Sequence, residues 1–293
     1  FIFMDLKEYN LSDELYIKMN SRGKPLTSFE NFKAKFEQYI ETVQDDVIFE
    51  KKNSAIKEKA DKGITTIKNL KQYFAYHIDT SWTNLVWAYC KDELKSLPDS
   101  DKDSAIVNLL DKKMANYIRY VFTNQYALKD RRKAVVLDEL FSGKKEEISF
   151  NRYQNHNILS ADALNFLIDS LNVLANGNDK ISVLLPENPT FDENAVFELI
   201  LRGETPKYIE RIMFYAYLTF LIKFGKDNIK DLEEWMSFVS RMTFGENRNG
   251  VIDGIDDFSQ DMATVCSIIS DMATKGNSSI TSWLKQRPHD DSS

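Results

Sequence analysis

Apolar residues recur every three or four positions along most of the chain. The longest stripe lies between residues 104 and 124, and shorter stripes lie in 28–44, 160–174, 232–239 and 258–272. This spacing is typical of helices that bury one face. Glycine and proline are scarce, with ten and six residues. The pattern therefore predicts a mainly α fold, a helical array of roughly nine helices.

Local signals predict where several helices begin and end. Thr27 and Glu30 have the spacing of a capping box, which predicts a helix from about residue 28 to 44. Ser160 is expected to cap another helix. Pro206 is expected in the first turn of a helix that ends at Gly225.

Other segments interrupt the helical pattern. Residues 97–103 and 245–257 are expected to be loops, and 181–191, with two prolines, an extended connection. Residues 45–66 are rich in Lys, Glu and Asp. This composition predicts either a solvated helix or a mobile connector. The apolar residues 1–6 predict one short strand.

Composition narrows the class of protein. The 293 residues carry a net charge of −7, which excludes a uniformly basic surface for nucleic acid. The most apolar stretch, 212–222, is too short to span a bilayer and predicts a buried helix. Cys90 and Cys266 both lie in apolar helical patterns and are expected to be buried free thiols, which fits a reducing cytoplasm.

The stretch 15–36 concentrates positive charge. It holds five Lys and Arg residues against one glutamate, a net of +4. Gly23 permits a tight turn, Arg22 offers a planar fork for phosphate, and the following helix start presents free N–H groups. Three interpretations stay open: an anion-binding loop, a solvated helix–loop–helix corner, and a DNA-binding helix-turn-helix, whose usual turn is shorter.

Other polar clusters give weaker signals. Asp99–Asp103 begins like a calcium loop but lacks the required glycine and glutamate. Asp253–Asp257 fits either a divalent cation or a helix amino-terminus. The basic run 128–133 is interpreted as a solvated loop, with nucleic-acid contact as the alternative. The three histidines have no metal-ligand spacing; they are His77, His156 and His289.

The amino-terminal part of the chain contains "FIFMDL" at 1–6, "LYIKMNSRGKPL" at 15–26, and then Glu30 and Lys33. In these features residues 1–36 resemble the domain-of-unknown-function 262 family, the amino-terminal domain of GmrSD-type restriction endonucleases and related phage-defence proteins. Tyr16 stands where the family usually has phenylalanine. The stretches "IDTSWTNLVW" and "RMTFGENRNGVID" also look like the helical part of large members.

This resemblance implies a division of the chain and a site. Residues 1–45 would be the end of a ParB-like nucleotide-binding domain and 46–286 an all-helical domain. The terminal residues 287–293 are expected to be a disordered tail because chain ends are often unordered. A nucleoside triphosphate, with or without Mg²⁺, is the implied ligand. The residues that match the family's motif beside the nucleotide pocket are Asn20, Arg22, Gly23 and Lys33.

Two functional hypotheses follow. In the first, the chain is a fragment of a nucleotide-dependent, DNA-targeting endonuclease that acts in phage defence. The family's D-G-Q-Q-R and HNH nuclease motifs are absent here, so the isolated chain is expected to show no turnover. In the second, it is a non-enzymatic helical interaction module, and loop 20–26 is only structural.

Overall fold

The computed structural model describes residues 26–43, 46–95, 98–129, 150–186, 191–244 and 254–286. These residues form twelve helices and no strand. In chain order the helices are α2 (Ser28–Val43), α3 (Val47–Asp61), α4 (Leu70–Asp79), α5 (Ser81–Lys95), α6 (Asp99–Lys129), α8 (Phe150–Asn155), α9 (Ala161–Leu174), α10 (Glu193–Arg202), α11 (Tyr208–Phe224), α12 (Ile229–Phe244), α13 (Ile255–Thr274) and α14 (Ile280–Lys285).

The helical part of the fold prediction is confirmed. The strand expected at residues 1–6 lies outside the described residues. Of the ParB-like remnant expected at 1–45, the structure describes 26–43, most of which form a helix, and the described ranges contain no strand, so the remnant is not supported. The tail 287–293 also lies outside them. Within these ranges, no helix combines the length and the apolar character that a membrane span requires.

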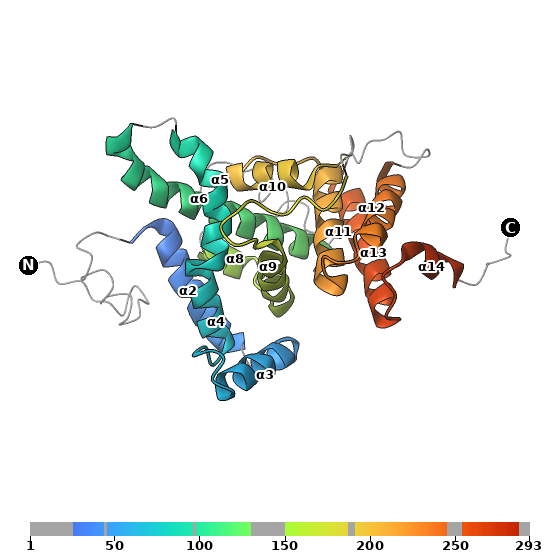
Figure 1. Cartoon of the computed structure of the whole chain (residues 1–293), viewed down its shortest axis with the longest axis horizontal. Helices are drawn as coiled ribbons and strands as arrows, with labels where there is room; N and C mark the ends of the chain where they lie inside the picture. The colour runs from blue at the N-terminus through green and yellow to red at the C-terminus, as the bar shows by residue number, and fades with distance from the viewer. Residues whose placement is uncertain are drawn as a thin grey trace, which may run out of the picture.

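Two long helices organise the packing. Helix α6 packs against α5, α10, α9, α13 and α2, and α11 packs against α13, α12, α9 and α10. Figure 1 shows α2, α3 and α4 at one end of the molecule and α12, α13 and α14 at the other. Helix α11 is buried at every position from Arg211 to Leu221, which confirms the buried helix predicted at 212–222. Apolar residues occupy every side of this helix, so packing against other helices on every side is favourable.

One hydrophobic core runs from Phe29 in α2 to Trp283 in α14. Helix α2, which the family resemblance assigns to a separate amino-terminal unit, contributes four buried residues: Phe29, Phe32, Phe36 and Ile40. Phe36 lies 5.2 Å from Phe74 of α4 and 5.7 Å from Phe122 of α6, measured between ring centroids. The hydrophobic core therefore includes residues from both sides of the domain boundary predicted at residue 45.

Residues 47–61 form a helix, so the helix alternative for 45–66 is correct within this range. The Asp46 side chain accepts a hydrogen bond from the Ile48 N–H at 2.9 Å and caps the helix. The helix is not fully solvated, because Phe49 and Ile56 are buried. On the same helix Lys52 forms an ion pair of 2.6 Å with Asp169 of α9.

Several predicted boundaries are wrong. The loop expected at 97–103 is largely helical, because α6 begins at Asp99. Acidic residue types are favourable near the amino-terminal end of a helix, so the composition of this stretch fits a helix as well as a loop. The sequence patterns also missed three short helices, namely α8, α10 and α14.

Pro206 does not lie in the first turn of α11. The helix begins at Tyr208 and its cap is Lys207, so the proline precedes the cap. The Glu210 carboxylate accepts the Lys207 N–H at 2.8 Å, and this bond fixes the helix start beyond the proline. The predicted end at Gly225 is confirmed.

Candidate functional site

An open groove of about 490 Å³ lies between α2, α4, α5 and α6. Four of its apolar lining residues are almost fully buried and form its floor: Phe29, Ile78, Val86 and Met114. Val107 of α6 also lines the groove and is 47% exposed. This volume lies within the range of roughly 300–1,000 Å³ that is common for ligand pockets.

Charged side chains form the walls of the groove. The lining contains five carboxylates and two lysines, which are Glu30, Glu37, Glu41, Asp79 and Asp111 together with Lys33 and Lys71. The described lining therefore has a net charge of −3. Such a surface favours a cationic ligand and disfavours a phosphate group.

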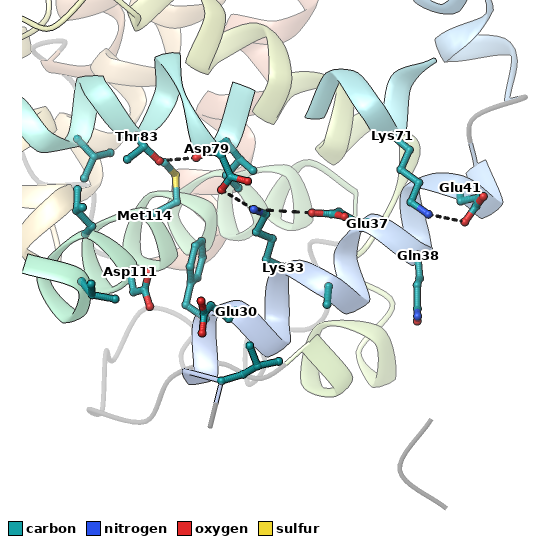
Figure 2. A pocket seen from close by; sticks show the side chains of 17 residues that line it. Glu30, Lys33, Glu37, Gln38, Glu41, Lys71, Asp79, Thr83, Asp111 and Met114 are labelled. Atoms are coloured by element: carbon teal, nitrogen blue, oxygen red, sulfur yellow. Dashed lines mark hydrogen bonds and ion pairs between the residues drawn. The ribbon is translucent and has the colours of Figure 1, made fainter. Parts of the chain in front are cut away.

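Both lysines form ion pairs with carboxylates of the same groove. Lys33 Nζ lies 2.5 Å from Asp79 Oδ1 and 3.9 Å from Glu37 Oε1. Lys71 Nζ lies 2.9 Å from Glu41 Oε2. Figure 2 shows Lys33 between its two partners and the Lys71–Glu41 pair further along α2. The Lys33–Asp79 and Lys71–Glu41 pairs connect α2 to α4, whereas the Lys33–Glu37 contact lies within α2.

The predicted capping box at the start of α2 is confirmed. The Thr27 hydroxyl accepts the Glu30 N–H, and the Glu30 carboxylate accepts the Thr27 N–H, both at 3.0 Å. The same hydroxyl donates to Asp111 Oδ2 of α6 at 2.7 Å. The first turn of α2 is therefore held against α6 at one end of the groove, with two carboxylates beside it.

Of the four residues that the resemblance singled out, Lys33 lies in the described part of the chain, on the groove wall. Its ammonium group is already bound to Asp79. Asn20, Arg22 and Gly23 lie outside the described residues. The structure thus neither brings these four residues together nor separates them.

The sequence patterns did not reveal the groove. One signal was present: Glu30, Lys33, Glu37 and Glu41 follow each other at helical spacing in the predicted helix 28–44. Residues at this spacing share one helix face, so a charged row beside the phenylalanine stripe was visible. The partners from α4, α5 and α6 were not, because they come from distant parts of the sequence.

The cysteines and histidines show no catalytic arrangement among the described residues. Cys90 is a buried free thiol as predicted, and burial raises its pKa to about 11, which keeps it protonated and weakly reactive. Cys266 is only half-buried, which corrects the second prediction. His77 packs on Tyr73 at 4.1 Å between ring centroids, and burial lowers its pKa.

The acidic clusters have a structural explanation. Asp256 and Asp257 lie in the first turn of α13, as the helix-terminus interpretation expects. Across the described ranges, no three His, Cys, Asp or Glu residues come close enough to hold a metal ion. Asp253 and the basic run at 130–133 lie outside these ranges.

A second polar cluster joins α6 to the end of α10. Asn116 Nδ2 donates to the Leu201 carbonyl oxygen at 3.0 Å, and Arg119 Nη2 donates to the Gly203 carbonyl oxygen at 3.2 Å. The last carbonyl groups of a helix have no partner inside it, so these side chains satisfy them. The cavity beside them is about 10 Å³, room for about one water molecule. We therefore assign this cluster a structural role, which is to hold the end of α10 against α6.

The fold and the groove together define an all-helical protein, within its described ranges, that carries an open hollow with an apolar floor and acidic walls. Comparisons of the chain with models of known families, with curated proteins and with solved structures give no match. The family resemblance of residues 1–36 therefore stays a prediction.

Proposed function

We propose that this chain is a non-enzymatic helical interaction module that binds a segment of another polypeptide in the groove between α2, α4, α5 and α6. The observation that carries the proposal is an open hollow of about 490 Å³ that combines an apolar floor with charged walls. Polypeptides offer both apolar anchors and charged side chains, and grooves between helices are a common place to dock them.

The apolar floor supplies the attraction. A large side chain placed against Phe29 and Met114 would leave water, and burying one such side chain is worth about 1.5–3 kcal/mol. Val107, exposed at the edge of the groove, extends the apolar surface toward solvent. The charged walls would then fix the orientation of the bound segment more than its affinity.

Filling the groove should abolish this binding. Ala34 lines the groove from α2, so Ala34→Trp places an indole in the hollow. We expect short peptides selected on the wild-type protein from a displayed random library to bind the variant at least about tenfold more weakly, a loss of about 1.4 kcal/mol. Fluorescence anisotropy with labelled peptides measures the change.

Ala55→Trp is the matched control. Ala55 is exposed on α3 and does not line the groove, so the same substitution there should leave the affinity unchanged. Circular dichroism should show that both variants keep their helical content. Equal affinity of the selected peptides for the wild type and Ala34→Trp would refute the groove as the binding site.

A second candidate function is a part of a nucleotide-dependent, DNA-targeting protein of phage defence. Two observations favour it: the resemblance of residues 1–36, and the position of Lys33, which belongs to the basic stretch 15–36, on the groove wall. In this case a nucleoside triphosphate would bind beside the start of α2, and the helical region would engage DNA or position a nuclease domain.

Arg22→Ala tests the second candidate. In the full-length protein that this candidate requires, we expect the substitution to weaken triphosphate binding by about 1.5–3 kcal/mol, because a guanidinium makes charge-assisted hydrogen bonds to phosphate. Isothermal titration calorimetry with Mg²⁺ present measures it. Arg241→Ala, on an exposed position of α12, should change nothing. A wild-type protein without triphosphate affinity, or an unchanged affinity in Arg22→Ala, excludes this role.

A further inference from the structure

From the charges and contacts of the groove we infer that its ligand is a cationic amphipathic helix, with lysine or arginine on one side and large apolar residues on the other. This inference rests on the proposed function and specifies the chemistry of the partner. Three features of the groove support it: the acceptor groups on the walls, the position of the apolar surface, and the length of the hollow.

The walls offer acceptors for further cations. Asp79 and Glu41 each bind one lysine, and their side chains are 66% and 57% exposed. A carboxylate has about four lone-pair sites, so each group has capacity for a second donor from a ligand. An incoming lysine or arginine therefore adds to the existing ion pairs.

An anionic ligand meets the opposite situation. Lys33 and Lys71, the cations of the described lining, already pair with carboxylates of the groove. A phosphate or a carboxylate would have to displace Asp79 or Glu41 while lying close to the other acidic groups. Like charges brought together in an interface are unfavourable, so the described lining selects against such ligands.

Most carboxylates and most apolar residues of the lining come from different helices. Four of the five carboxylates come from α2 and α4, whereas α5 and α6 contribute one carboxylate, Asp111, and four apolar residues: Val86, Val107, Leu110 and Met114. Figure 2 shows the carboxylates Glu30, Glu37 and Glu41 in a row along α2, with Asp111 of α6 beside the first turn of that helix. A ligand that matches this arrangement has its charged residues on one face and its apolar residues on another, which is the property of an amphipathic helix.

The groove has the length of a short helix. Its charged row on α2 extends from Glu30 to Glu41, which corresponds to about 16 Å at the helical rise of roughly 1.5 Å per residue. A bound helix of about three turns spans the same distance. Met114, on the floor, is a flexible side chain that adapts to apolar anchors of different shape.

Three synthetic peptides test the inference, each of about 11–12 residues to match the groove. The first has leucine at every third or fourth position and lysine on the opposite face. The second replaces each lysine by glutamate, and the third scrambles the first. We expect the lysine peptide to bind at least about tenfold more tightly than the other two, and to weaken as salt is raised.

Variants of the protein connect the binding to the walls. Asp79→Asn combined with Glu41→Gln should lower the affinity for the lysine peptide by at least about tenfold, since two acceptor charges are lost. Asp227→Asn combined with Glu233→Gln, at two exposed positions outside the groove, is the charge-matched control and should have no effect. Both proteins should retain the wild-type circular dichroism spectrum.

The outcomes separate this inference from the proposed function. If the glutamate or scrambled peptide binds as tightly as the lysine peptide and Ala34→Trp still blocks binding, the groove binds polypeptides but the inferred chemistry is wrong. If Ala34→Trp does not reduce the binding of any peptide, the proposed function itself fails. Tighter binding of Mg²⁺–triphosphate or of duplex DNA than of the lysine peptide overturns the inference in favour of the second candidate.

Discussion

Replacing Phe36 by alanine is expected to destabilise the whole protein by about 3–5 kcal/mol. The Phe36 side chain is fully buried and lies 5.6 Å from Phe32 as well as close to Phe74 and Phe122. Its removal leaves a cavity where α2, α4 and α6 meet. The neighbouring aromatic rings are closely packed and cannot shift far enough to fill it. Urea denaturation followed by circular dichroism measures the free energy of unfolding.

Tyr76→Ala is the control for this result. Tyr76 is an aromatic residue of α4 with 54% exposure, so its loss should change the free energy of unfolding by less than about 0.5 kcal/mol. The two variants also test the domain organisation. A separate early transition in Phe36→Ala, with the main transition unmoved, would show that α2 unfolds independently of the later helices and would support the boundary predicted at residue 45.

Gly203→Ala is expected to cost about 2–4 kcal/mol, for two reasons that add. Gly203 ends α10 with φ = 78°, a left-handed conformation that a Cβ atom disfavours. A Cβ at this position would also lie 2.7 Å from Nδ2 of Asn116. Asn116 can move away only by weakening its hydrogen bond to the Leu201 carbonyl. The free energy of unfolding in urea measures the loss.

The chain contains a matched control that separates the two causes. Gly63 follows α3 with φ = 69° and the same pair of backbone hydrogen bonds, but a Cβ atom added there would have no other atom within 4 Å. Gly63→Ala should therefore cost about 1–2 kcal/mol, the conformational part alone. In an Asn116→Ala background, the cost of Gly203→Ala should fall to the same value. Equal costs for both glycines in the wild-type background would contradict the steric explanation.

The strongest helices were predictable from sequence because their determinants are local. The helix at 28–43 has a capping box and an apolar stripe that includes Phe29, Phe32 and Phe36, and both features form within consecutive turns. The same holds for α9, where the Ser160 side chain accepts the Ala163 N–H. Such signals do not depend on the rest of the chain, so they appear in the folded protein as the sequence predicts.

The short helices were missed for the opposite reason. Helices α8 and α14 have six residues each, too few for a periodic pattern, and isolated helices of this length are unstable in water. Their stability comes from packing: Phe150 of α8 lies 6.0 Å from Phe32, and Trp283 of α14 is buried. Sequence periodicity does not contain these contacts.

The candidate site also has one part that the sequence predicts and another part that only the packing decides. The sequence by itself determined the helical class, the charged row on α2 and the cationic character of Lys33, because these follow from residue type and helical spacing. The tertiary structure alone decided that Lys33 meets Asp79, a residue 46 positions away, and that four helices enclose an acidic groove around an apolar floor. The physical reason is that the charge of a groove is the sum over side chains that only packing brings together.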